Sequence, residues 1–348
     1  MPKRCSPPLA SFPSPGTMRP TLHPRLVNGR FGDPGLFVEQ LHRRRALLFD
    51  LGDLSPLSVR DLLRVSHVFV THTHIDHFIG FDLLLRVNVG RDKSIELVGP
   101  PGIAEQVGSK LGGYRWDLVD RYQADLVFQV TELHPGGRTL AARFRLKRAF
   151  AREDLDQGQA RDGLVAQVDG LRVRAALLEH HGPCLGYAVD EPAHVNVCRN
   201  RVEARGLPAG PWLQGLKQAV LQGRPDDWPV DLPDGPLPLG ELRELVSVAP
   251  GQKIAYVTDV ADTSANRGAI ADLARGADIF FLEACFSAAD SAQARARAHL
   301  TTTATGEIGR AAGARRLEPF HFSPRYEGEE ERMLGEVEAA FSAGSGAS

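Results

Sequence analysis

The sequence has few cysteines, no long apolar run and almost no net charge. Its four cysteines stand far apart without a CxxC pair, which argues against a disulfide framework and a cysteine zinc knuckle. No apolar run reaches the roughly 18 residues that span a bilayer, and no export signal follows Lys3 and Arg4. Because 41 basic and 43 acidic side chains nearly cancel, a nucleic-acid or membrane partner would need a local basic patch. These absences favour a cytoplasmic location.

The composition divides the chain into a short tail and one large folded region. Residues 1–20 are rich in proline and serine, which predicts a disordered tail, and Met18 is an alternative start. Beyond them, short apolar runs alternate with helical patterns, which is typical of layered α/β architecture. Strands are predicted at 46–52, 67–71, 94–99, 253–258 and 278–283, and a further strand is predicted to end at His321. Helices are predicted at 58–65, 302–313 and 326–341.

The most informative segment is the run of three histidines and one aspartate at residues 72–77, directly after a predicted strand. His72 and His74 are two residues apart, so an extended or tightly turning backbone points both imidazoles at one cation. Asp76 and His77 then turn toward a neighbouring point. Imidazole and carboxylate together suit zinc, manganese or iron, and two adjacent clusters would form a two-metal site. A polar loop with unrelated histidines is the alternative interpretation.

HxHxDH after a strand resembles the signature of the metallo-β-lactamase superfamily, and the later motifs resemble its ribonuclease Z branch. These later motifs are at 178–187, 256–260 and 321–326, whereas 27–35 and 50–58 depart from the branch's pattern. The resemblance implies a four-layer αβ/βα sandwich and two divalent cations, zinc first, with manganese or iron as alternatives. It also implies the ligands His72, His74, Asp76, His77, His180, Asp259 and His321, with Asp259 shared. His181 remains an alternative to His180, and each later residue taken singly also has a structural interpretation.

Two more motifs resemble the segments that carry catalytic helpers in this branch. Residues 282–286 supply Glu283, and residues 298–302 supply His299. With Asp76 they form the expected catalytic set: Asp76 orients a metal-bridged hydroxide, and Glu283 with His299 protonates the departing ribose oxygen. The alternatives are a buried ion pair for Glu283 and a neighbour of a helix cap for His299.

The resemblance implies a phosphodiesterase that trims the 3' ends of precursor tRNA, and a homodimer. Residues 21–348 would form one hydrolase domain, from which residues 191–250 protrude as a substrate-binding arm. A local basic excess in this arm supplies candidate phosphate contacts at Arg199, Arg201, Arg205 and Lys217. A solvated loop of mixed charge is the alternative for the arm. A small-molecule metallohydrolase, acting on a phosphodiester or another ester, and a non-catalytic metal-binding protein are the alternatives for the whole chain.

Overall fold

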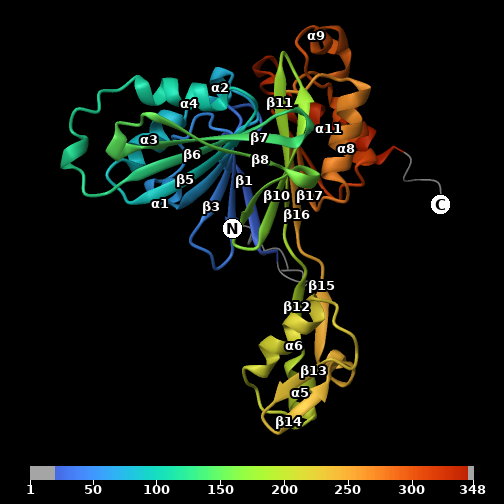
Figure 1. Ribbon diagram of the computed structural model, residues 1–348. Coiled ribbons are helices and arrows are strands. Elements are labelled where there is room, and N and C mark those ends of the chain that lie inside the picture. Colours follow the sequence, from blue (N-terminus) through green and yellow to red (C-terminus); the bar gives the residue numbers. More distant parts are fainter. Residues whose placement is uncertain (1–19, 344–348) are drawn as a thin grey trace, which may run out of the picture. The chain divides into compact units, whose positions relative to one another are not determined.

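The computed structural model describes residues 20–343, so the predicted tail falls almost wholly outside the described residues. Two compact units are present. The main unit consists of Leu22–Pro192 and the chain from Gly251 onward, and the small unit is Ala193–Pro250 (Figure 1). Within residues 20–343 no helix has the length and apolar character needed to cross a membrane.

The first sheet of the main unit has eight strands in the order of the sequence. Neighbouring strands are antiparallel at both sides, but β3 to β6 run parallel. The strands are β1 Leu22–Leu26, β2 Leu36–Gln40, β3 Ala46–Phe49, β4 Val65–Phe69, β5 Lys93–Gly99, β6 Leu126–Leu133, β7 Arg138–Arg145 and β8 Arg152–Gln159.

The second sheet has six strands in the order β18-β17-β16-β11-β10-β9. Strands β16, β17 and β18 run parallel, and β16 pairs antiparallel with β11. The strands are β9 Leu164–Val168, β10 Leu171–Glu179, β11 Pro183–Asp190, β16 Lys253–Val257, β17 Ile279–Glu283 and β18 Leu317–Phe320.

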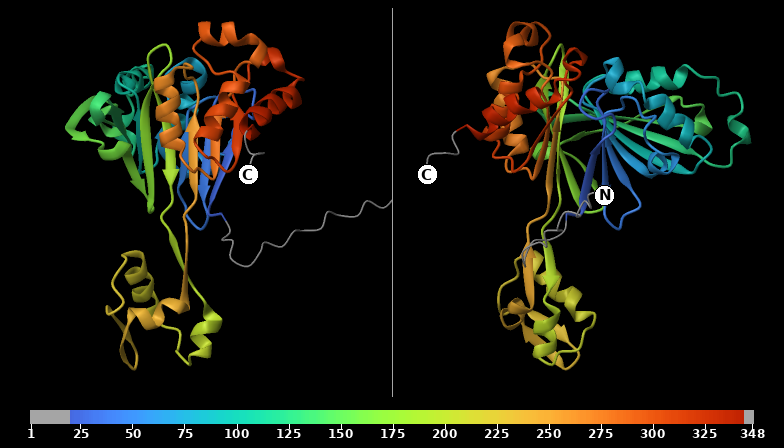
Figure 2. Two further views of the ribbon diagram at one scale, coloured as in Figure 1. Left: turned by 90° about the vertical axis from the view of Figure 1, so that its right-hand side faces the viewer. Right: turned by 180° about the vertical axis from the view of Figure 1, so that it is seen from behind.

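Helices cover the outer face of each sheet (Figures 1 and 2). The helices beside the first sheet are α1 Val59–Arg64, α2 Ile75–Phe78, α3 Phe81–Asn88 and α4 Ile103–Gly112. Those beside the second sheet are α8 Ser264–Ala274, α9 Ser291–Ala296, α10 Thr302–Ala311 and α11 Glu330–Ser342.

Three apolar layers hold this arrangement together. Side chains alternate across a strand, so each sheet buries one face against helices and the other against the opposite sheet. Val68 and Leu97 pack toward α3 and α4, whereas Phe69 and Tyr256 belong to the layer between the sheets. A third layer, which includes Leu282, lies between the second sheet and α8 and α10. The four-layer αβ/βα sandwich predicted from the sequence is confirmed.

The parallel strands bring polar residues together at one edge of this sandwich. The chain just beyond β4, β16 and β18 supplies His72, Asp259 and His321. In α/β proteins the carboxyl ends of parallel strands are where ligands commonly bind. Asp259 and His321 have φ angles of 50° and 57°, a left-handed conformation that is uncommon outside glycine and clusters at functional sites.

The small unit has its own apolar core around Trp212, Leu216 and Leu239. It contains two pairs of short antiparallel strands, β12 with β15 and β13 with β14. Its elements are β12 His194–Val197, α5 Arg199–Ala204, α6 Trp212–Leu221, β13 Pro229–Leu232, β14 Gly235–Pro238, α7 Leu239–Leu242 and β15 Val246–Ala249.

Candidate metal centre

The histidine motif forms a tight turn between β4 and the short helix α2. His74 is the N-cap residue of α2, so the chain is extended through His74 and becomes helical at Ile75. The ring centroid of His72 lies 4.4 Å from that of His74 and 4.1 Å from that of His77. The turn therefore gathers the three imidazoles around one point, although only His72 and His77 are buried.

Two groups of metal-ligating side chains meet at this turn. Every residue in a group offers one ligand atom, and within a group these atoms lie within 4.8 Å of one another. The first group is His72, His74, His180 and Asp259; the second is Asp76, His77 and His321.

Asp259 lies between the two groups. Its Oδ2 is 3.6 Å from Nε2 of both His72 and His180, which belong to the first group. Its Oδ1 is 3.3 Å from Nε2 of His77 and 3.1 Å from Nδ1 of His321, which belong to the second. One carboxylate thus faces both groups, one oxygen to each, which is the arrangement that a ligand shared by two cations needs.

His180 is held in place by a backbone contact. Its Nδ1 lies 2.9 Å from the carbonyl oxygen of Ala298, so this nitrogen carries the proton and Nε2 is free to act as a ligand. His181 is exposed, and its ring centroid lies 6.3 Å from that of His74. The geometry therefore favours His180 over His181 as the ligand, with His181 at the rim.

Burial and neighbouring charges set the protonation of the ligand groups. Burial lowers the pKa of His72 to about 2, so its imidazole is neutral. Burial alone would raise the pKa of Asp259, but the imidazoles of His321 and His77 outweigh it and hold the pKa well below its usual range. Burial likewise opposes ionisation of Asp76, yet contact with His321 lowers its pKa to about 2. Burial lowers the pKa of His77, but the negative charges of Asp259 and Asp50 outweigh it and raise this pKa well above its usual value, so a cation would replace the proton on this ring. Ionised carboxylates and neutral imidazoles are the forms that bind metals.

Buried nitrogen atoms that make no hydrogen bond provide a separate test of the fit. Nε2 of His72, Nε2 of His77 and Nδ1 of His321 are buried and have no hydrogen-bond partner. Such atoms are rare because an unsatisfied buried polar group costs free energy. All three point into the two groups, where a divalent cation would satisfy each of them. The residues present therefore fit two divalent cations.

Asp50 supports the second group and was missed by the sequence analysis. This fully buried carboxylate lies 3.0 Å from Nδ1 of His77 and accepts hydrogen bonds from the backbone N–H of Thr71 and the hydroxyl of Tyr256. It thereby fixes the ring of His77 with Nε2 toward the cation position. Its sequence signal was present: an aspartate directly after the buried strand β3.

Glu283 and His299 form a pair beside both groups. Nδ1 of His299 lies 2.9 Å from Oε2 of Glu283, whose other oxygen accepts the backbone N–H of Val260 at 2.6 Å. Burial would lower the pKa of His299, but the negative charge of Glu283 raises it to about 9. The ring centroid of His299 is 5.0 Å from that of His180 and 5.6 Å from that of His321. The pair thus places a protonated imidazole next to the candidate metal site.

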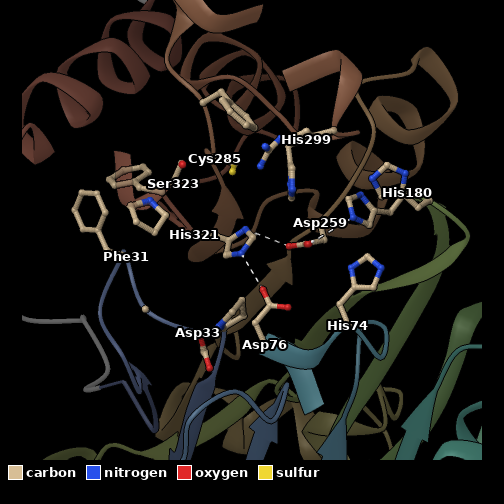
Figure 3. Close-up of a pocket in the computed structure, with 17 residues that line it drawn as sticks. Phe31, Asp33, His74, Asp76, His180, Asp259, Cys285, His299, His321 and Ser323 are labelled. Carbon is tan, nitrogen blue, oxygen red and sulfur yellow. Dashed lines mark ion pairs between the residues drawn. The ribbon is translucent and has the colours of Figure 1, made fainter. Parts of the chain in front are cut away.

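One pocket of about 410 Å³ is lined by His180 and His299 and by His74, Asp76, Asp259 and His321, which project into it (Figure 3). Arg297, an exposed residue, also lines this pocket. The sequence analysis did not single out this guanidinium, since an isolated arginine carries no motif.

The four basic residues predicted to bind substrate lie in the small unit. Nη1 of Arg201 donates to the carbonyl of Glu244 at 2.7 Å, and Arg205 donates to the carbonyl of Glu241. These two guanidinium groups help to hold the small unit together. Arg199 is exposed and Lys217 is partly exposed.

Comparison with curated proteins identifies close relatives, although no family model matches the chain. Ribonuclease Z of Deinococcus radiodurans is 33% identical over 302 residues, which cover 85% of this chain and 88% of the relative. Ribonuclease Z of Trichodesmium erythraeum is 32% identical, and the match covers 82% of this chain and 76% of the relative.

Solved structures agree with the observed fold. The metallo-β-lactamase fold protein YhfI from Bacillus subtilis aligns with a TM-score of 0.53 at 14% identity, covering 91% of this chain and 92% of that one. The short form of human tRNase Z aligns with a TM-score of 0.50 at 16% identity, covering 88% of this chain and 93% of that one. The fold is therefore that of the metallo-β-lactamases, and the sequence relatives show that the chain belongs to the ribonuclease Z family of metal-dependent hydrolases.

Proposed function

We propose that the protein is an endonuclease that hydrolyses a phosphodiester bond at the 3' end of precursor tRNA. One observation carries the proposal: members of both ligand groups that share Asp259 line the same pocket as His299, which is paired with the buried Glu283. A metal-binding protein without turnover needs the ligands but not this second pair. Membership of the ribonuclease Z family supports RNA as the substrate.

We propose His72, His74 and His180 as ligands of one cation, and Asp76, His77 and His321 as ligands of the other, with Asp259 shared. This donor set of imidazoles and carboxylates favours zinc, and manganese and iron are the alternatives to test. When bound, the cations supply Lewis acidity: they lower the pKa of water and stabilise negative charge on the phosphoryl oxygens.

The chain's own residues position the reactants and move the protons. The ionised carboxylate of Asp76 orients the attacking water, which releases one proton to solvent. The water oxygen forms a bond with phosphorus as the bond to the 3' oxygen of the ribose breaks. An oxyanion of this kind leaves poorly unless it receives a proton. His299 holds that proton on the imidazole that contacts Glu283, and Glu283 keeps the ring protonated and oriented.

We propose that the small unit contributes phosphate contacts through Arg199, Arg201, Arg205 and Lys217. Each contact would add affinity that weakens with salt. The resemblance to ribonuclease Z also favours a homodimer, which sedimentation of the full chain would test.

The test is cleavage of a precursor tRNA labelled at its 5' end, with zinc or manganese present. We expect one product that ends just beyond the acceptor stem and carries a 3' hydroxyl. Hydrolysis of a chromogenic phosphodiester without RNA cleavage would instead indicate a small-molecule hydrolase. If the protein bound metal but hydrolysed neither substrate, the catalytic proposal would be wrong.

A further inference from the structure

A third set of ligand atoms lies beside the candidate metal site, and it includes a thiol. Glu283, Cys285, His299 and His321 each offer one atom, and these atoms lie within 4.8 Å of one another. In Figure 3, Cys285 and His299 lie on one side of His321, and Asp76 lies on the other. Cys285 belongs to neither of the two groups that share Asp259.

The environment of Cys285 suits cation binding better than other thiol chemistry. The residue is 7% exposed, lines the active-site pocket and forms no disulfide. Burial raises the pKa of its thiol far above the usual range, and the negative charges of Glu283 and Asp259 raise it further. The thiol is therefore neutral and a poor nucleophile on its own. A cation bound beside the thiol would lower its pKa again, because a coordinating thiol loses its proton.

We propose that Glu283, Cys285 and His299 form a third, inhibitory cation site that takes zinc in excess or another thiophilic divalent cation such as cadmium. The inference rests on the proposed function of Glu283 and His299 for its inhibitory effect, but not for the binding itself. A thiolate with an imidazole and a carboxylate is a donor set that zinc accepts, whereas magnesium and manganese prefer oxygen ligands. On binding, the thiol releases its proton to solvent, a sulfur–cation bond forms, and no oxidation takes place.

The consequence for activity follows from the shared residues. A cation on His299 replaces the proton that this ring holds for the leaving oxygen. Glu283 then binds the cation and no longer holds the imidazole of His299 in its protonated form. His321 is also within reach, so the third site competes with the second ligand group for this side chain. The rate should therefore rise with zinc at low concentration and fall at higher concentration. With manganese it should rise to a plateau.

Cadmium titration of the full chain tests the site, with Cys285→Ser compared with the wild type. Cadmium bound to a thiolate gives an ultraviolet charge-transfer band that imidazole and carboxylate ligands do not. We expect the band in the wild type and its loss in Cys285→Ser, and Cys285→Ala provides a second variant should the first not fold. Cys198→Ser removes a thiol from the small unit, so it is the matched control and should keep the band.

Inhibition is measured on the manganese-loaded enzyme, each variant relative to its own cadmium-free rate. We expect Cys285→Ser to raise the cadmium concentration for half-inhibition by about tenfold or more. Loss of a residue that only orients a ligand commonly costs about 10–100-fold in metal affinity, and Cys285 would bind the cation directly. A band that persists in both Cys285 variants, or no band in the wild type at saturating cadmium, would overturn the proposal. Because the band needs no substrate, this result is independent of whether RNA is cleaved.

Discussion

At the scale of single residues, Asp50 is expected to affect metal affinity although it belongs to neither ligand group. Its carboxylate is fully buried and touches His77, Thr71 and Tyr256, so each of its oxygens has a partner. We predict that Asp50→Asn weakens metal binding about 10–100-fold, the usual effect of removing a group that orients a ligand. Competition with a chromophoric chelator measures this. Asp53→Asn, at an exposed position close in sequence, is the control and should leave affinity unchanged.

The variant Glu283→Gln tests the role of His299 as proton donor through the pH dependence of the cleavage rate. Loss of a positioned acid typically costs a factor of about 10²–10⁴ in rate. With Glu283 present the pKa of His299 is raised to about 9, so the ring stays protonated until the pH rises through that value. Glutamine removes the negative charge and lowers this pKa, so the decline of the rate at alkaline pH should begin at lower pH. Glu105→Gln, on the exposed surface of α4, should leave the profile unchanged, and an unshifted alkaline decline in Glu283→Gln would contradict the role of Glu283.

His67 gives a stability prediction that does not depend on the metal site. Burial in β4 lowers the pKa of this imidazole from 6.5 to about 4, and the positive charge of Arg45 acts in the same direction. The unfolded chain therefore binds the proton more readily, so stability should fall as the pH drops below about 6.5 toward 4. His67→Gln should reduce the loss in free energy of unfolding between pH 7 and pH 5, as measured by urea denaturation. His23→Gln, at an exposed position, is the control.

At the scale of elements, apolar patterning predicted β3, β4, β5, β16, β17 and β18 but missed the buried strands β2, β6, β10 and β11, and it placed several strand ends imprecisely. The strand predicted at 46–52 ends at Phe49, because Asp50 has φ 56° and turns the chain out of the sheet. The helix predicted at 326–341 begins at Glu330, after a short 3₁₀ turn. β8 was not predicted, since its eight residues are almost all polar and exposed; only pairing with β7 makes it a strand.

The small unit allows a prediction about a single element, α6. Leu216 is fully buried in its core, and a leucine-to-alanine change at such a site costs about 2–5 kcal/mol. We expect Leu216→Ala to expose residues 193–250 to limited proteolysis while the main unit stays resistant. If the small unit binds RNA, precursor cleavage should fall more than hydrolysis of a chromogenic phosphodiester. Leu221→Ala, where the side chain is 45% exposed, is the matched control, and equal loss of both activities would argue against an RNA-binding role.

At the scale of the molecule, the site could be predicted only in part because its residues are brought together over long sequence distances. His72, His74 and His77 form a local cluster whose spacing alone indicates a metal. Asp259 and His321 carry no local signal of their own and were identified through resemblance to a family. Asp50 and Cys285 lie next to the predicted ligands only because separate strands end at one edge, which sequence patterning does not specify.

Metal removal tests this long-range assembly directly. Three buried nitrogen atoms that make no hydrogen bond cost the metal-free fold free energy. Cations that bind only the native state stabilise it by about 4 kcal/mol at a thousandfold excess over Kd. Chelation should therefore lower the Tm, and zinc or manganese should restore it. The variant His72→Ala should show a smaller change in Tm on removal and return of metal. The variant His42→Ala, at an exposed position, should show the same change as the wild type. An unchanged Tm after complete removal of metal would mean that the two groups do not hold cations in the folded protein, because binding to the native state must appear as stability.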